Sequence, residues 1–143
     1  ARGAFLGLTL AHEQGDLVRA VMEGVAFACL DAFNVLVELG AAPTEIVLAG
    51  GGAKSALWRQ IIADSFGLPV KPLLVSEQSA TGACILAGLG VGVVEQGSIV
   101  ADWVRYGGPT LPNPALHASY VDQHARFRDA YANNRNLFVM RNQ

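Results

Sequence analysis

The sequence predicts an α/β unit in which helices alternate with parallel strands. Two short, uniformly apolar runs at residues 46–49 and 70–75 are typical of strands covered on both faces of a sheet. Segments with apolar residues spaced by three and four lie before, between and after these runs and predict helices. Because only two strands are evident, the sheet is expected to be incomplete, with partner strands supplied by sequence outside this chain or by another chain.

The first helix is predicted over residues 16–39, where the apolar period leaves only a narrow polar stripe. Asp16 is its expected N-cap and Gly40 its expected C′ residue, so the start and stop signals agree with the period. Arg19 and Glu23 stand four residues apart and are expected to form an ion pair on its surface.

The second helix is predicted over residues 56–66, directly after the first strand and its glycines. Ser55 is the expected N-cap, and Gly67 is expected to end the helix. Trp58 and Phe66 fall at helical spacing, which favours a core position for both aromatic rings. The second strand follows, with its proline expected near an edge or a bulge.

The last third of the chain gives weaker signals. A helix rich in small residues is predicted to open at Ser76 or Ser79 and to run to about residue 89. A short helical piece is expected near residues 93–101, and residues 107–114 form a loop. A terminal helix is then predicted by the period of Leu116, Tyr120, Phe127 and Tyr131, followed by a polar tail from residue 133.

Composition narrows the possible partners. The 143 residues are 52% hydrophobic and 15% charged, with a formal net charge of −2, which provides no positive surface for nucleic acid. No stretch of about 18 apolar residues runs without charge, so no membrane span is expected. Cys29 and Cys84 lie in apolar segments and are expected to be buried free thiols of a cytoplasmic protein. Ala1 is expected to be a cut edge, which makes the chain part of a larger protein.

The segment at residues 50–55, Gly-Gly-Gly-Ala-Lys-Ser, is the candidate binding site. Glycines there expose main-chain N–H groups beside a helix N-terminus, an arrangement that suits a phosphate group. Ala53 stands where a Walker A loop requires glycine, and Ser55 stands where the dinucleotide fingerprint requires one, so neither motif fits. A tight turn without a ligand remains the alternative. His12, His117 and His124 share no ligand spacing, and no metal site is expected.

Four segments occur in an order that is specific in combination: ARGAFLGLTLAH, DLVRAVMEGVAFA, LAGGGAKSALWRQIIADSFGLPV and TGACILAGLGVG. Together they resemble the C-terminal half of the FGGY carbohydrate kinases, most closely those of xylulokinase type. The resemblance covers nearly the whole chain. It implies that residues 1–143 are the C-terminal nucleotide-binding domain of an actin-like, ribonuclease-H-like ATPase, whose two lobes close around ATP and a sugar.

The same resemblance implies a set of nucleotide contacts. The glycine turn would lie against the α-phosphate and ribose, the next two residues near the adenine or its ribose, and the small residues of the third helix would form another wall. The residues expected to contact ATP or ADP are Gly51, Gly52, Ala53, Lys54, Ser55, Gly82 and Ala83. No catalytic residue and no Mg²⁺ ligand is assigned to this chain, because family members carry the base and the metal-binding phosphate loop in the preceding region.

The resemblance therefore implies an intact enzyme that converts ATP and D-xylulose to ADP and D-xylulose 5-phosphate, with the sugar held mainly by an N-terminal lobe absent here. The chain alone is expected to be inactive, and Asp31 and Asp64 are expected at surface or packing positions rather than as bases. Two alternatives stay open. One is a related kinase of glycerol, gluconate, ribulose or fuculose, and the other is a non-catalytic module that forms a homodimer through its incomplete sheet.

Overall fold

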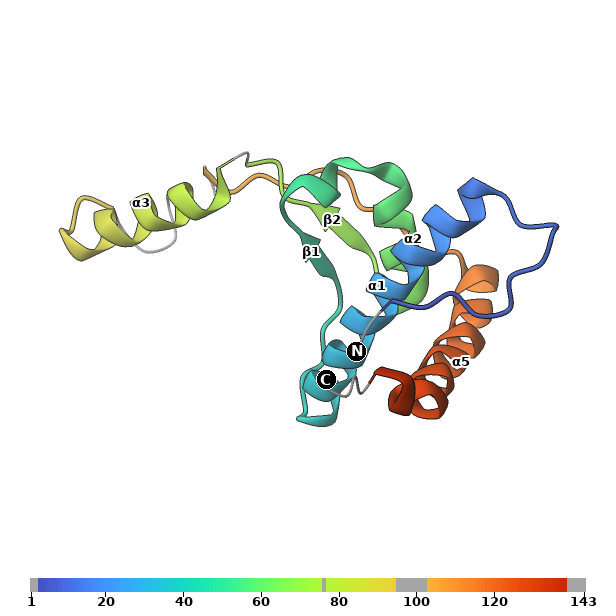
Figure 1. Ribbon diagram of the computed structural model, residues 1–143. Coiled ribbons are helices and arrows are strands. Elements are labelled where there is room, and N and C mark those ends of the chain that lie inside the picture. The colour runs from blue at the N-terminus through green and yellow to red at the C-terminus, as the bar shows by residue number, and fades with distance from the viewer. Residues whose placement is uncertain (1–2, 76, 95–102, 139–143) are drawn as a thin grey trace, which may run out of the picture.

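The structure is a computed structural model that describes residues 3–75, 77–94 and 103–138 (Figure 1). The elements are α1 (Gln14–Glu38), β1 (Ile46–Leu48), the 3₁₀ turn η1 (Gly51–Lys54), α2 (Ala56–Phe66), β2 (Val70–Pro72), α3 (Gln78–Gly90) and α5 (Pro114–Phe138). The order confirms the expected alternation of helix and strand. Most of the helical piece expected near residues 93–101 lies outside the described residues.

The sheet contains β1 and β2, which pair in parallel with Ile46 opposite Val70. Beyond β2 there are two antiparallel bridges, one between Val70 and Thr110 of the expected loop and one between Leu73 and Tyr106 just before that loop. Both amide-carbonyl hydrogen bonds of the first bridge are short, at 2.9 and 2.8 Å. Residues 106–110 thus extend the sheet on the side of β2 that faces away from β1.

The core lies between the sheet and helices α1, α2 and α5, which gather on one side of it (Figure 1). Its buried residues are Ala26, Ile61, Ile62, Ala63 and Val70. Val47 of β1 is 46% exposed, so the expectation that β1 is covered on both faces was wrong for this chain. A uniformly apolar strand predicts a covering layer on each face of the sheet. The described residues supply a layer on one face only.

Helix α1 begins two residues earlier than expected. Glu13, not Asp16, is the N-cap, and the two residues form a reciprocal capping box. In it the Asp16 carboxylate accepts a 2.9 Å hydrogen bond from the Glu13 amide. At the other end Gly40 has φ +95°, as the C′ assignment requires. The Arg19–Glu23 ion pair is confirmed at 2.8 Å.

Helix α2 matches its prediction at both ends. The Ser55 hydroxyl accepts a 3.2 Å hydrogen bond from the Trp58 amide, which satisfies one N–H of the first turn. Gly67 takes the left-handed conformation at the C-cap, with φ +67°. Trp58 and Phe66 are half-buried and pack against the core, so their expected packing role is confirmed.

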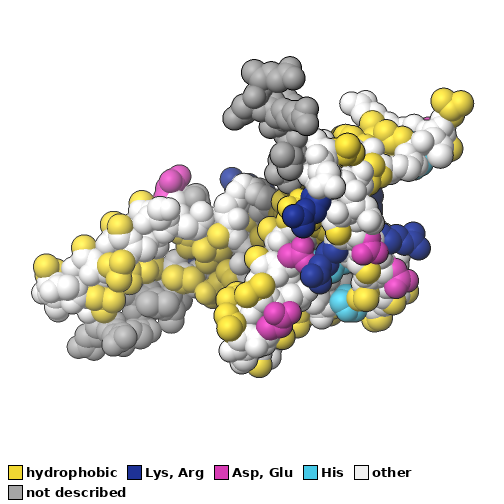
Figure 2. Space-filling model, turned by 60° about the horizontal axis from the view of Figure 1, so that its bottom comes forward, with side chains coloured by type: hydrophobic (Ala, Val, Ile, Leu, Met, Phe, Trp, Pro, Cys, Tyr) yellow, Lys and Arg dark blue, Asp and Glu magenta, His cyan; other side chains and the backbone are white. Residues whose placement is uncertain are grey.

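Helix α3 projects away from the rest of the molecule (Figure 1), and none of its described residues is buried. Figure 2 shows hydrophobic side chains along this projecting arm, whereas acidic and basic side chains are interspersed over the body. Cys84 of α3 and Cys29 of α1 are both exposed, so their expected burial was wrong. Their apolar sequence context indicates contact surfaces that the described residues leave uncovered.

Helices α1 and α5 are joined by a polar network around Tyr120, which is 3% exposed. Its hydroxyl donates a 2.6 Å hydrogen bond to Glu23 and accepts one of 3.0 Å from Arg19. The Tyr120 ring also meets Phe27 edge to face, at 5.8 Å between centroids. Burial, and then the bond to Glu23, raise the pKa of Tyr120 above its ordinary value of 10.0.

Alkaline pH should therefore weaken the fold through Tyr120. The folded chain holds the phenolic proton more tightly than the unfolded chain, so this stabilisation is complete below pH 10.0 and is lost as pH rises through the higher folded pKa. Tyr120→Phe should cost about 1 kcal/mol at pH 8 and remove this part of the alkaline loss. Urea unfolding at about pH 8 and pH 11 measures both effects, with the half-exposed Tyr131→Phe as control. Equal alkaline losses in wild type and Tyr120→Phe would contradict the assignment.

Helix α1 is also long and apolar enough to cross a membrane by length and composition, with a mean hydropathy of 1.7 over its best 18-residue window. Core helices of soluble proteins pass the same test. In this fold α1 buries Ala26, Phe27 and Leu30 and bonds to α5 through Arg19 and Glu23. These contacts cover only part of its apolar surface, because Val18, Val21 and Val35 stay more than half exposed.

Candidate functional site

The glycine turn η1 lies at the carboxyl end of β1. Gly50 reverses the chain there with φ +80° and ψ −167°, a conformation that L side chains rarely adopt. The first hydrogen bond within the turn runs from the Ala53 amide to the Gly50 carbonyl at 3.2 Å. The amides of Gly51 and Gly52 precede that bond, so they take no part in the hydrogen bonds within the turn. Both glycine residues are exposed, so the turn is open to a ligand.

The two glycines have different surroundings. A Cβ added to Gly51 would meet nothing within 4 Å, so the space above this residue is open. A Cβ added to Gly52 would stand 3.0 Å from the Trp58 indole. Close packing against Trp58 therefore favours glycine at position 52 whether or not a ligand binds, whereas packing does not account for Gly51.

Ala53 lies beneath the turn. It is 3% exposed, and its amide is bonded to Gly50. Its carbonyl accepts a 2.6 Å hydrogen bond from Nη1 of Arg59, whose Nε also lies 3.4 Å from the Thr110 hydroxyl. The sequence did not single out Arg59, because neither partner stands at helical spacing from it.

Lys54 and Ser55 close the turn. Lys54 is exposed at its last position. Ser55 donates its amide to the Gly52 carbonyl at 3.1 Å and caps α2 with its hydroxyl. The N-terminus of α2 thus places partial positive charge at the end of the glycine turn, and Lys54 is part of the turn.

Gly82 and Ala83 lie in the first half of α3. Because β1 and β2 are parallel, the glycine turn and the start of α3 follow the same edge of the sheet (Figure 1). The helix then leads away from the body, and an added Cβ at Gly82 would meet no described atom within 4 Å. The described residues do not bring the expected second wall against the glycine turn.

Asp64 is a buried carboxylate at 1% exposure, which places it at a packing position. One of its oxygens accepts bonds of 2.8 Å from Gln60 and 2.7 Å from the Asn113 amide. Its own carbonyl lies 2.8 Å from Nδ1 of His117, and a carbonyl can only accept, so that nitrogen carries the proton. Asn113 and Pro114 begin α5, so Asp64 fixes the start of that helix. The Asn-Pro pair is a helix-start signal in the sequence, whereas nothing in the sequence linked this start to Asp64.

Elsewhere in the described part of the chain, the ionisable cluster at Asp31 forms contacts between helices. Among the described residues, no group of three or more His, Cys, Asp or Glu side chains is placed to hold a metal ion. Asp31 of α1 pairs with His124 at 3.0 Å and lies 3.6 Å from Arg128. Both partners belong to α5, so the cluster joins the two helices.

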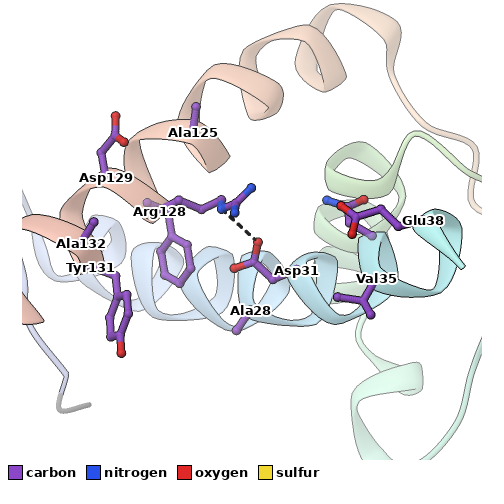
Figure 3. A pocket seen from close by; sticks show the side chains of 11 residues that line it. Ala28, Asp31, Val35, Glu38, Ala125, Arg128, Asp129, Tyr131 and Ala132 are labelled. Atoms are coloured by element: carbon purple, nitrogen blue, oxygen red, sulfur yellow. Dashed lines mark ion pairs between the residues drawn. The ribbon is translucent and has the colours of Figure 1, made fainter.

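An open groove of about 890 Å³ runs between α1 and α5 (Figure 3). Asp31 and Arg128 face each other across it, with Val35 and Tyr131 at either side. Its lining belongs to α1, α5 and neither strand, so the groove is separate from the glycine turn. Sequence periodicity predicted the two helices and not the hollow between them.

The chain is similar in sequence to known carbohydrate kinases. The sequence model of the family described as "FGGY family of carbohydrate kinases, C-terminal domain" matches residues 1–91. A xylulose kinase of Staphylococcus epidermidis is 32% identical over 139 residues, which cover 95% of this chain and 28% of that protein. A glycerol kinase of Citrifermentans bemidjiense is 39% identical over 104 residues, which cover 72% of this chain and 21% of that protein.

The crystal structure of a xylulose kinase from Rhodospirillum rubrum superposes with a TM-score of 0.85 at 34% identity, covering 98% of this chain and 29% of that one. The chain thus spans between a fifth and a third of the length of these relatives. The expected fold, part of the C-terminal lobe of an actin-like ATPase, is confirmed. The chain belongs to the FGGY family of carbohydrate kinases and is a C-terminal domain of that family.

Proposed function

We propose that this chain is the nucleotide-binding part of an ATP-dependent kinase that, as a complete protein, transfers the γ-phosphoryl group of ATP to a hydroxyl of a sugar. The observation that carries the proposal is the glycine turn of an FGGY-family chain, with two exposed glycines at the carboxyl end of a parallel strand. Ligands of open α/β sheets bind at this edge.

The contacts within the site follow from the chemistry of each group. The amides of Gly51 and Gly52 would donate to phosphate oxygens, and the bare Cα of Gly51 would let the phosphate approach closely. Lys54 would add positive charge near the nucleotide. Ala53 and Ser55 would hold the shape of the turn. Gly82 and Ala83 would form the opposing wall once α3 is in place against the remainder of the enzyme.

We propose that Mg²⁺ and the catalytic base are held by the remainder of the complete protein, as the family resemblance implies. Phosphoryl transfer depends on positioning and charge neutralisation. The chain therefore contributes nucleotide positioning, and we expect it to be inactive alone. A cytoplasmic location is proposed because ATP and sugar are both available there.

D-Xylulose is the proposed sugar, because proteins named xylulose kinase match this chain over its greatest length. The glycerol kinase similarity keeps the related polyols as alternatives. The test is a coupled assay of ADP release by the complete protein with D-xylulose, glycerol, gluconate, ribulose and fuculose. The proposal expects one sugar to support turnover far above the rest. No ATP consumption with any of them would overturn it.

Self-association is a second proposal, favoured by the uncovered apolar surface. Exposed hydrophobic residues lie along α1, and a further one lies on β1; they include Val18, Val21, Val25, Val35, Leu36 and Val47. Patches of this kind mark contact surfaces. The 143-residue chain is therefore expected to form dimers or larger assemblies in light scattering, and a monomer at high concentration would contradict this proposal.

A further inference from the structure

Arg59 connects the glycine turn to two other parts of the fold. It projects from the first turns of α2, and its Nη1 donates a 2.6 Å hydrogen bond to the Ala53 carbonyl inside η1. Its Nε lies 3.4 Å from Oγ1 of Thr110, the residue that bridges to Val70. One guanidinium thus joins the turn, the helix that follows it and the segment paired with β2.

The contact between Arg59 and the Ala53 carbonyl matters because the turn has little else to hold its shape. Gly50, Gly51 and Gly52 have no side chains of their own to hold the turn, and glycine loses more conformational freedom on ordering than any other residue. The Gly51 and Gly52 amides can bind an anion tightly only if they are already aimed when it arrives. The Ala53 carbonyl is the anchor directly after them, and a charged donor holds it more firmly than a neutral one would.

We propose that Arg59 is a positioning residue for nucleotide binding: it fixes the glycine turn from below and lowers the cost of ordering it around the phosphates. This inference rests on the proposed nucleotide site and adds a residue to which neither the glycine pattern nor the ligand contacts point. Its guanidinium faces the turn carbonyl, so it acts on the nucleotide through the turn.

The test uses the complete kinase and the variants Arg59→Met and Arg59→Lys. Methionine keeps the length of the stem and removes both donors, whereas lysine keeps the charge and loses the planar fork. The expected result for Arg59→Met is a KM for ATP raised about tenfold, with the KM for the sugar changed less than about twofold. Arg59→Lys should recover part of the loss. Arg126→Met, at an exposed arginine of α5, is the matched control and should leave both KM values unchanged.

Thr110→Val completes a double-mutant cycle, because valine matches the shape of threonine without its hydroxyl. If the two residues hold the turn together, the combined variant with Arg59→Met should be no worse than Arg59→Met alone. Thermal unfolding of each variant accompanies the kinetics. Should Arg59→Met fail to fold, Arg59→Lys and Thr110→Val carry the same test through their own KM for ATP.

The outcomes separate this inference from the proposed function. If wild type turns over ATP and Gly51→Val raises its KM, while Arg59→Met folds with a wild-type KM for ATP, the inference about Arg59 is overturned and the site stands. If Arg59→Met raises the KM values of ATP and sugar together, it acts on the whole fold and the inference is again overturned. If wild type neither binds nor consumes ATP, the proposed function itself fails.

Discussion

Substitution of Gly51 by valine is expected to weaken nucleotide binding about 100-fold while leaving the fold intact. The added Cβ would meet no described atom within 4 Å, so the side chain costs the chain no packing. It would instead fill the open space above the turn, where a phosphate must come within hydrogen-bonding distance of the Gly51 and Gly52 amides. Loss of two such charge-assisted bonds, at about 1.5 kcal/mol each, corresponds to about two powers of ten in affinity.

Calorimetric titration of the complete protein with ADP measures this loss, and thermal unfolding without nucleotide measures the fold. Gly15→Val is the matched control, because Gly15 also has open space around its Cα and lies at the start of α1. Gly52→Val is less informative, since its Cβ would press on Trp58 and disturb the turn directly. A Gly51→Val protein that bound ADP as tightly as wild type would remove the turn from the nucleotide site.

Asp64→Ala is expected to lower the free energy of unfolding by about 3 kcal/mol. The carboxylate is 1% exposed, and one oxygen holds both the Gln60 side chain and the Asn113 amide. Alanine would take away the acceptor of the Asn113 amide and one of the two acceptors of the Gln60 side chain, which also donates to the Leu111 carbonyl. It would also remove a negative charge from the N-terminus of α5, where such a charge is favoured. The loss should appear as a lower urea midpoint with little change in slope.

Ser65→Ala is the control for that measurement. Ser65 is adjacent in α2 and 2% exposed, but its hydroxyl has no hydrogen-bond partner among the described residues. Its removal should therefore be neutral or slightly stabilising, because a buried hydroxyl without a partner costs free energy. Equal losses for the two variants would show that the Asp64 bonds contribute little beyond simple packing.

Local signals in the sequence predicted the elements well where several coincided. Helix α2 was correct at both ends because the serine cap, the apolar period and the closing glycine all agree within a dozen residues. The predicted start of helix α1 was wrong, because either Glu13 or Asp16 can serve as the cap and the two residues form a capping box together. Such exchanges depend on side-chain geometry that the residue types alone do not determine.

Contacts between distant parts of the chain were predicted least well. Nothing in the sequence linked Arg59 to Thr110, or Tyr120 to Glu23, because each pair is separated by at least 51 residues and carries no periodic pattern. The predicted burial of Cys84 and Val47 was too high. An apolar sequence indicates that a surface is covered in the assembled protein, but it does not indicate which polypeptide covers that surface. For the site, the turn and its exposed glycines followed from the residues, whereas the support beneath the turn did not.

The contact between Gly52 and Trp58 gives the molecule an optical reporter. An indole lying against the turn should change its emission when a polyanion settles a few ångströms away, so occupancy could be followed in unlabelled protein. Only Trp103 shares this chromophore within the chain, and replacing it by phenylalanine would isolate the signal. Rapid mixing would then time the arrival and departure of the nucleotide independently of any sugar.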